Sequence, residues 1–175
     1  MTAATAGTMT VAAGLLQELE QEAQTTRRLL ERVPDTRLSW RPHEKGRALG
    51  ELAMHVAMVP GSVAALASLP SPAQAPDFAD PPAPPTTTEL VMAFDESLAK
   101  AKRILEGMND AAATETWRLM AGPRELVAMP RAAFMRAIML NHWYHHRGQL
   151  SVYLRFLGVP LPSIYGPSAD ENPFA

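Results

Sequence analysis

The chain contains no cysteine among its 175 residues. Disulfide bonds, a thiolate nucleophile supplied by the protein and thiolate ligation of a metal are therefore all excluded. A metal bound by this chain must use nitrogen and oxygen donors. If a thiol takes part in its chemistry, that thiol comes from a second substrate.

Charge is also scarce, since Asp, Glu, Lys and Arg make up 19% of the residues and the formal net charge is -2. Proteins that bind nucleic acid present a basic surface, and the slight excess of acidic over basic residues in this chain does not indicate one. We therefore expect no nucleic-acid partner.

Long apolar runs are also missing from the sequence at first inspection. We find no apolar window near the roughly 18 residues of a membrane span, and residues 1–11 have no Lys or Arg ahead of their weakly apolar stretch. The sequence thus predicts a cytoplasmic protein without a membrane segment.

Apolar residues account for 47% of the chain, which suffices for the core of one domain spanning residues 1–175. Apolar positions three and four apart predict long helices. The expected ranges are 10–33, 48–68, 86–108 and 130–157. Residues 1–8 are expected to be disordered, 69–85 to form a proline-rich loop, and 159–175 to be an irregular tail.

Residues 110–129 fit no helical pattern and are expected to form a short extended or turn segment. We find no alternation of apolar and polar residues strong enough to demand a sheet. Four long helices with short or irregular connections predict an all-α fold, namely a four-helix bundle.

Histidines mark the candidate site. His142 and His146 are one helical turn apart, and both fall on the apolar stripe of the last helix with Met135 and Ile138. His55 points from the apolar face of the second helix. His43, in contrast, lies in a charged loop and is not expected to be a ligand.

Three neutral imidazoles on one side of an ion form a mononuclear site with open positions for water or substrate. We therefore predict one divalent transition metal on His55, His142 and His146, with zinc, nickel, iron and manganese all open. The alternative is that each histidine only makes a local hydrogen bond in the core.

Four further side chains are candidates for catalysis. His145 could replace a ligand or act as an acid or base, and Gln149 could reach bound water or tie two helices together. Glu51 could orient His55 or serve its own helix start. Tyr153 is expected to pack, with a hydroxyl that could reach the site. Arg147 points away from it and is expected at the surface or in a dimer contact.

Several segments resemble the DinB family, also called DinB/YfiT-like. They are R-L-S-W-R-P, G-E-L-A-M-H-V, N-H-W-Y-H-H-R-G-Q-L, L-R-F-L-G-V-P-L-P and Y-G-P-S-A-D-E, in that order along the chain. The most specific element is His-x-x-x-His-Arg-Gly-Gln after a lone helical histidine. In one departure, Ala48 stands where the family often has a serine helix cap.

The resemblance implies a four-helix bundle with up-down-down-up connections, often a homodimer, with one metal on His55, His142 and His146. The family is similar in fold to S-transferases and isomerases that use bacillithiol, mycothiol or glutathione, in which the metal activates the thiol. Its name refers to DNA-damage-inducible expression, which implies a stress response and says nothing about DNA binding.

These observations together predict a metal-dependent enzyme in which a low-molecular-weight thiol or water attacks a small electrophile. One alternative is a metal-dependent hydrolase that needs no thiol. The other is a non-catalytic helical bundle that binds a ligand or dimerises.

Overall fold

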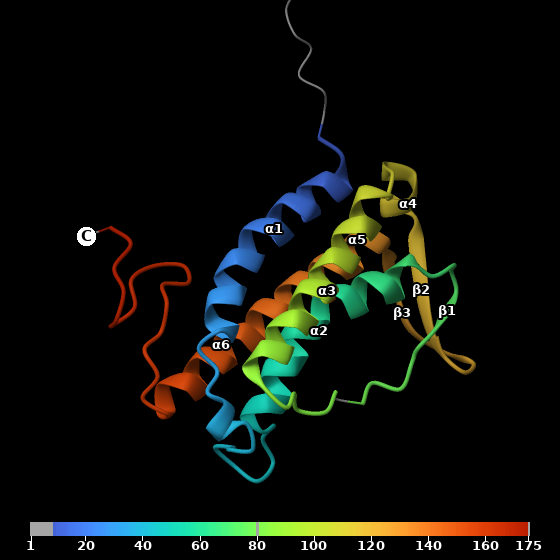
Figure 1. Ribbon diagram of the computed structural model, residues 1–175. Helices are drawn as coiled ribbons and strands as arrows, with labels where there is room; N and C mark the ends of the chain where they lie inside the picture. The colour runs from blue at the N-terminus through green and yellow to red at the C-terminus, as the bar shows by residue number, and fades with distance from the viewer. Residues whose placement is uncertain (1–8, 80, 175) are drawn as a thin grey trace, which may run out of the picture.

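The computed structural model describes residues 9–79 and 81–174 (Figure 1). Its helices and strands follow the chain in the order α1 (Val11–Leu30), η1 (Asp35–Arg37), α2 (Leu49–Ser68), β1 (Ala73–Gln74), α3 (Thr87–Glu106), α4 (Asp110–Thr114), β2 (Thr116–Ala121), β3 (Arg124–Pro130), α5 (Arg131–Phe134), η2 (Met135–Asn141) and α6 (His142–Phe156). The expected disorder of residues 1–8 lies outside the described residues.

The three N-terminal long helices form where the sequence predicts them, and their caps explain why. The Thr10 hydroxyl accepts a hydrogen bond from the Ala13 amide (3.1 Å) at the start of α1, and the Thr86 hydroxyl accepts one from the Glu89 amide (3.2 Å) at the start of α3. At the start of α2, Ala48 has no side-chain oxygen, but Glu51 accepts a hydrogen bond from its amide (2.7 Å).

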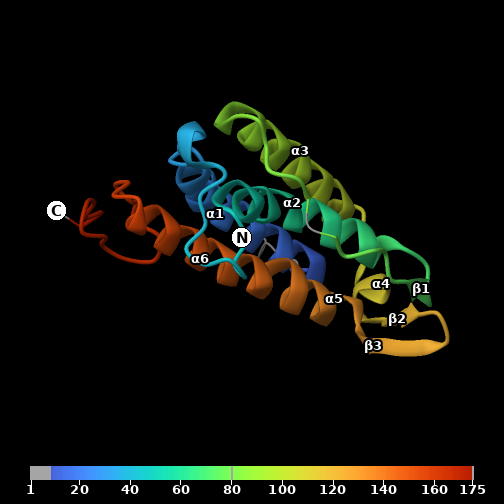
Figure 2. The same ribbon diagram turned by 90° about the horizontal axis from the view of Figure 1, so that it is seen from below.

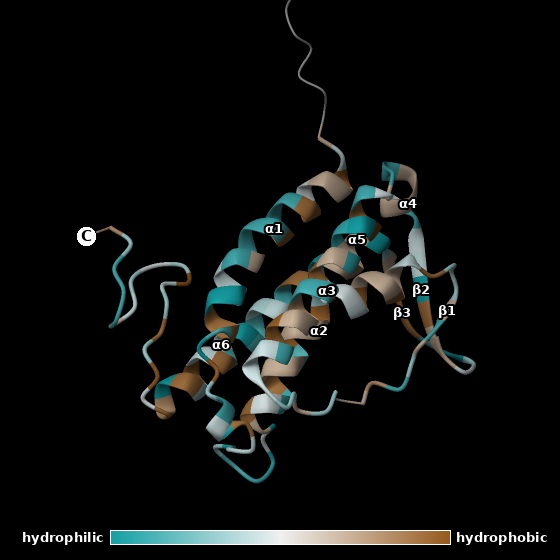
Figure 3. Ribbon diagram, viewed as in Figure 1, coloured by the Kyte–Doolittle hydropathy of each residue, from teal (hydrophilic) through white to brown (hydrophobic). Residues whose placement is uncertain are grey.

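Helix α2 lies at the centre of the helical layer. It packs against α3 on one side and against η2 and α6 on the other (Figure 2). Figure 3 shows hydrophilic residues on the outward faces of α1 and α3, whereas α2 is mostly white to brown. An amphipathic helix buries one stripe, but a helix covered by neighbours on several sides can be apolar all round.

The apolar character of α2 corrects one expectation. By length and composition alone, Leu49–Ser68 is apolar enough to cross a membrane, so the prediction that no such window exists is wrong. Core helices of water-soluble proteins meet the same criterion. In this structure α2 is such a core helix, since most of its residues are buried against other elements.

The approach of α2 to α3 is unusually close at Gly61. A Cβ atom added at this glycine would lie 2.6 Å from the carbonyl oxygen of Ser97 and 2.9 Å from its Cα. The Gly61 amide donates to the Ser97 hydroxyl (2.9 Å), which in turn donates to the Met58 carbonyl (3.1 Å). Glycine at position 61 therefore permits direct contact between the two helix backbones.

The prediction of a purely all-α fold is wrong, because a small three-stranded sheet is attached to one end of the helices (Figures 1 and 2). β2 and β3 form an antiparallel hairpin in which Thr116 pairs with Pro130 and Ala121 with Arg124. β1 lies in the proline-rich segment and pairs with β2 in parallel. Residues 110–129 thus form α4 and most of a hairpin rather than a simple extended crossing.

Local chemistry explains the hairpin. Its two-residue loop is Gly122-Pro123, and Gly122 has a φ of 57°, a value open to glycine and suited to the first central position of a tight hairpin turn. Trp117 and Leu119 of β2 face inward. Trp117 packs against Phe134 with ring centroids 4.8 Å apart and ring planes tilted by 47°, and this contact helps to fix the sheet to the start of the last helical segment.

The last helical segment covers residues 131–156, close to the expected 130–157, but it is less regular than expected. Arg131–Phe134 is α-helical, Met135–Asn141 is a π-helix, and the α-helix resumes at His142. The segment stops where predicted, at Gly158 with a φ of 71°. A π-helix frequently marks a functional site, and this one ends directly before the first histidine of the predicted pair.

The irregular tail is tied to the helices. Glu171 pairs with Arg28 of α1, and Asp170 pairs with Arg155 of α6. Both pairs involve side chains that are substantially exposed to solvent, so each contributes little to stability. The tail also reaches the buried side chain of Arg147, which donates a hydrogen bond to the hydroxyl of the exposed Tyr165 (2.5 Å).

Candidate metal centre

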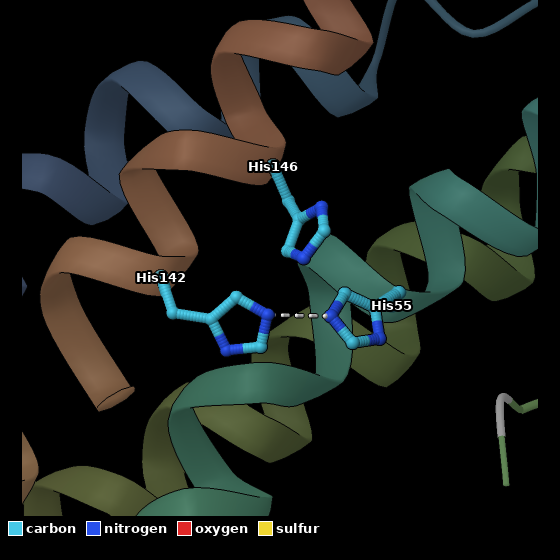
Figure 4. A group of neighbouring side chains, drawn as sticks. All are labelled: His55, His142 and His146. Atoms are coloured by element: carbon cyan, nitrogen blue, oxygen red, sulfur yellow. Dashed lines mark hydrogen bonds between the residues drawn. The ribbon is translucent and has the colours of Figure 1, made fainter. Parts of the chain in front are cut away.

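Three histidine rings from two helices converge between α2 and α6 (Figure 4). The ring centroids of His55 and His142 are 5.2 Å apart, those of His55 and His146 are 4.5 Å apart, and those of His142 and His146 are 4.4 Å apart. One nitrogen from each ring lies within 4.8 Å of the other two. The structure thus brings together the three predicted ligand candidates.

The spacing of these nitrogens fits a single ion. The Nε2 atoms of His55 and His142 are 3.3 Å apart. Two nitrogens that each lie about 2.1 Å from one ion at a tetrahedral angle are separated by about 3.4 Å. The cluster could therefore hold a metal ion with only small side-chain adjustments.

Gln149 fixes the orientation of His146. Its Oε1 atom is 2.7 Å from Nδ1 of His146, one helical turn earlier on α6. An amide oxygen only accepts hydrogen bonds, so Nδ1 carries the proton and Nε2 keeps its lone pair. This is the arrangement in which metal-binding histidines are usually held. Gln149 thus contacts a histidine of the cluster and does not tie two helices together.

Burial keeps two of these rings neutral. It lowers the pKa of His146 to about 4, even though the hydrogen bond with Gln149 opposes the shift. It also lowers the pKa of His142, with further lowering by the positive charges of His145 and Arg47. A neutral imidazole is the form that binds metals, so both rings are ready to act as ligands at neutral pH.

The lowered pKa values predict how the metal-free protein responds to acid. A histidine in an unfolded chain has a pKa near 6.5. Below that pH, the unfolded chain therefore binds a proton at position 146 that the folded chain does not bind until the pH nears 4. The free energy of unfolding is therefore unaffected by this residue above pH 6.5. It falls as the pH drops towards 4, by at most about 3 kcal/mol for this residue. Urea unfolding at several pH values measures it.

Two variants test the assignment of this pH effect. His146→Gln removes the titrating ring and is expected to flatten the loss of stability between pH 6.5 and 4. His43→Gln removes an exposed loop histidine and should leave the profile of the wild type unchanged. An equal slope in the wild type and His146→Gln would contradict the prediction.

The two helices are locked together beside the cluster by a buried hydrogen bond. The indole nitrogen of Trp143 donates to the Val56 carbonyl (2.8 Å). In a regular helix this carbonyl would accept from residue 60, but Pro60 has no N–H to donate. Because Val56 follows His55 and Trp143 follows His142, the bond holds the two helices together at the two facing rings.

A cavity of about 770 Å³ opens beside the cluster, between α2, the hairpin and η2. His55 and His142 line it together with the residues Arg47, Met58, Val59, Ser62, Val63, Leu66, Pro76, Asp77, Phe78, Ala79, Pro81, Leu119, Leu126, Val127, Phe134 and Ile138. A site of this size can bury most of a drug-sized molecule.

The other sequence candidates lie outside the three-histidine cluster. His145 is exposed, and its ring centroid is 5.0 Å from that of His146. Glu51 caps the start of α2 and lies 3.6 Å from Arg41. Tyr153 packs edge-on against Trp40, with centroids 5.6 Å apart. His43 accepts a hydrogen bond from the Lys45 amide in its loop.

Arg47 belongs to the site but was not among the predicted residues, and Arg147, outside the site, lies in a different environment from the one predicted. Arg47 lines the cavity, and its charge acts on both His142 and His146. Its position directly before the helix that carries His55 could have indicated that Arg47 lies near the site. Arg147 does point away from the cluster, but the prediction of a surface position is wrong, because it is 1% exposed.

Comparisons with known proteins agree with these features. A model of the DinB family matches residues 8–173. The uncharacterized protein YrdA of Bacillus subtilis (strain 168) is 26% identical over 157 residues, which cover 89% of each chain. A DinB-like protein from Bacillus cereus ATCC 10987 has a TM-score of 0.71 at 23% identity, over 87% of this chain and 96% of that one.

A second solved structure, the DinB-like protein YjoA from Bacillus subtilis, has a TM-score of 0.63 at 19% identity. The match covers 86% of this chain and 97% of that one. At these identities the likeness shows a shared fold, and the histidine geometry of this chain carries the argument about its site.

Proposed function

Because the chain belongs to the DinB family, we propose that it is a metal-dependent enzyme in which His55, His142 and His146 hold one divalent transition metal. The observation that carries this proposal is the convergence of three imidazoles at the edge of a 770 Å³ cavity. Imidazole donors suit zinc, nickel and iron better than manganese, which prefers oxygen.

With three protein nitrogens as ligands, a bound divalent metal keeps positions open and lowers the pKa of a thiol or water there. We propose that a low-molecular-weight thiol is the cosubstrate, because the chain has no cysteine of its own. In this S-transferase reaction the thiol proton passes to solvent and the sulfur forms a bond to an electrophilic carbon. The leaving group departs with the electron pair of the broken bond.

The contributions of the protein residues follow from their contacts. Gln149 holds the His146 ring with its Nε2 lone pair free, and the bond from Trp143 to Val56 sets the spacing of α2 and α6. The apolar cavity walls exclude water from an electrophile bound there. His145 is exposed, and its ring lies beside that of His146.

Metal analysis of protein purified without a metal-affinity column tests the proposal, together with an activity screen. We expect about one divalent ion per chain, and turnover of electrophiles that requires both the ion and an added thiol. Turnover without added thiol would show that the enzyme is a hydrolase and not an S-transferase. A near-zero metal content in protein offered zinc, nickel, iron and manganese in turn would overturn the metal site.

The Trp143 bond leads to a further prediction. Trp143→Phe removes the donor to the buried Val56 carbonyl and should cost about 1–3 kcal/mol of stability. It should also weaken metal binding about 10- to 100-fold, as loss of groups that orient ligands usually does. Urea unfolding and metal titration measure the two effects.

Two variants separate positioning from stability. Trp117 is equally buried and donates to the Leu69 carbonyl, which keeps a second donor in Arg131. Trp117→Phe should therefore leave metal affinity unchanged. Adding Pro60→Ala to Trp143→Phe supplies a helical N–H to Val56, so it should recover stability but not affinity. Equal affinities in Trp143→Phe and wild type would refute the positioning role.

Four finer predictions belong to the same proposal. α1 and the last helical segment run in one direction, and α2 and α3 run in the other (Figure 1), which supports a four-helix bundle with up-down-down-up connections. A homodimer, a cytoplasmic location and a role in stress response remain predictions. Sedimentation analysis of the purified protein tests the dimer.

A further inference from the structure

The cavity beside the histidines has apolar walls. α2 contributes Met58, Val63 and Leu66, the hairpin contributes Leu126 and Val127, and η2 contributes Ile138. Met58, Leu126 and Ile138 are each 37–40% exposed. Apolar side chains left open to a concave space indicate a ligand site, because covering them removes apolar surface from water.

The polar groups of the cavity are few and unevenly placed. His55 and His142 contribute ring nitrogens from the histidine cluster, and the Arg47 charge acts on His142. Arg47 and Asp77 are the only charged side chains among the described lining residues, apart from the titratable histidines. Asp77 follows β1 and is exposed to solvent, and Ser62 of α2 adds one exposed hydroxyl. The cavity therefore offers a polar end at the cluster and an apolar body beyond it.

From this asymmetry we infer that the cavity binds the electrophilic substrate, and that this substrate is an uncharged molecule with an extended apolar body. Its reactive group lies at the histidine end, and its apolar part lies between α2 and the hairpin. This inference rests on the proposed function, and it assigns the cavity to one of the two substrates.

The chemistry of the other substrate supports the assignment. Low-molecular-weight thiols such as glutathione carry several charged and polar groups. Burying such groups against Val63, Leu66 and Leu126 without hydrogen-bond partners costs free energy. An apolar electrophile gains from the same walls, so the cavity selects it over the thiol.

Ligand binding to metal-free protein tests the cavity separately from the metal. The uncharged fluorophore N-phenyl-1-naphthylamine is bound first, in the presence of a chelator, and is then displaced by unbranched primary alcohols from butanol to decanol. We expect affinity to rise about fourfold for each added methylene until the cavity is filled. The absence of any dependence on chain length would overturn the inference.

Variants locate the binding site. Leu126→Asp places a charge on the cavity wall from β3 and is expected to weaken alcohol binding at least about tenfold. Ile138→Thr is the milder second variant from η2 and should weaken it about threefold. Val152→Asp is the control, because Val152 is a similarly exposed apolar residue on α6 outside this cavity. Unchanged binding in Leu126→Asp and Ile138→Thr would refute the assignment.

The remaining outcomes are also decisive. If Leu126→Asp converts a dimer into a monomer and the fluorophore competes with dimer formation, this face is an interface between copies and the inference is overturned. Chain-length-dependent binding in a protein that takes up no metal would support the cavity while overturning the metal-dependent function. Metal uptake without alcohol binding would support the metal site and overturn the assignment of the cavity.

Discussion

Replacing His142 by alanine is expected to lower the metal content of the purified protein from about one ion per chain to near zero. Nε2 of His142 lies 3.3 Å from Nε2 of His55, so the variant removes one of three convergent donors. Two remaining imidazoles from different helices form a much weaker site. Elemental analysis after purification without a metal-affinity column measures the change.

His145→Ala is the matched control for this variant. His145 belongs to the same helix, and its ring lies beside His146, yet it is outside the three-histidine cluster. Its replacement should leave the metal content unchanged, while any loss of turnover would assign it a part in proton transfer. Equal metal contents in His142→Ala and wild type would exclude His142 as a ligand.

Replacing Arg147 by methionine is expected to destabilise the fold by about 3–5 kcal/mol. Nη2 of Arg147 is 2.6 Å from the carboxylate of Glu22, and the two side chains are 1% and 12% exposed. The guanidinium also donates to the Thr26 hydroxyl and lies over the rings of Tyr144 and Tyr165. Its loss leaves the Glu22 carboxylate, whose side chain is mostly buried, without the arginine that pairs with it.

Urea unfolding of three variants tests this account. Arg155→Met removes an arginine whose side chain is 44% exposed, in its pair with Asp170, and should cost no more than about 1 kcal/mol. Adding Glu22→Met to Arg147→Met removes the orphaned carboxylate and should recover part of the lost stability. Equal costs for Arg147→Met and Arg155→Met would show that the buried pair has no special role.

The long helices could be predicted because their apolar spacing is regular and their ends carry clear signals. The sheet could not, because each of its strands is short and carries few inward-facing residues. β2 buries only Trp117 and Leu119, and β1 comprises two residues inside a proline-rich segment. Pairing between such strands depends on contacts distant in sequence, which no local pattern reveals.

The three histidines could be predicted for the same reason as the helices, because helical periodicity assigns each ring to an apolar face. Their supporting contacts depend on side-chain rotamers, which periodicity does not determine. The Gln149 bond to His146 and the burial of Arg147 between two tyrosines belong to this group. The Val56 carbonyl is an exception, because a proline four residues later signals a carbonyl without a helical donor.

The contact of Gly61 with Ser97 also bears on how the protein accommodates ligands of different size. Two helix backbones that are already in contact cannot move closer together, so we expect α2 and α3 to behave as one rigid wall. Room for a larger ligand must then come from the opposite side, where the hairpin is held by the packing of Trp117 against Phe134, by the hydrogen bond from the Trp117 indole to the Leu69 carbonyl and by the pairing of β2 with β1. For the electrophile proposed above, we therefore expect the position of the three-stranded sheet relative to this wall to limit the size of the molecule that the cavity accepts.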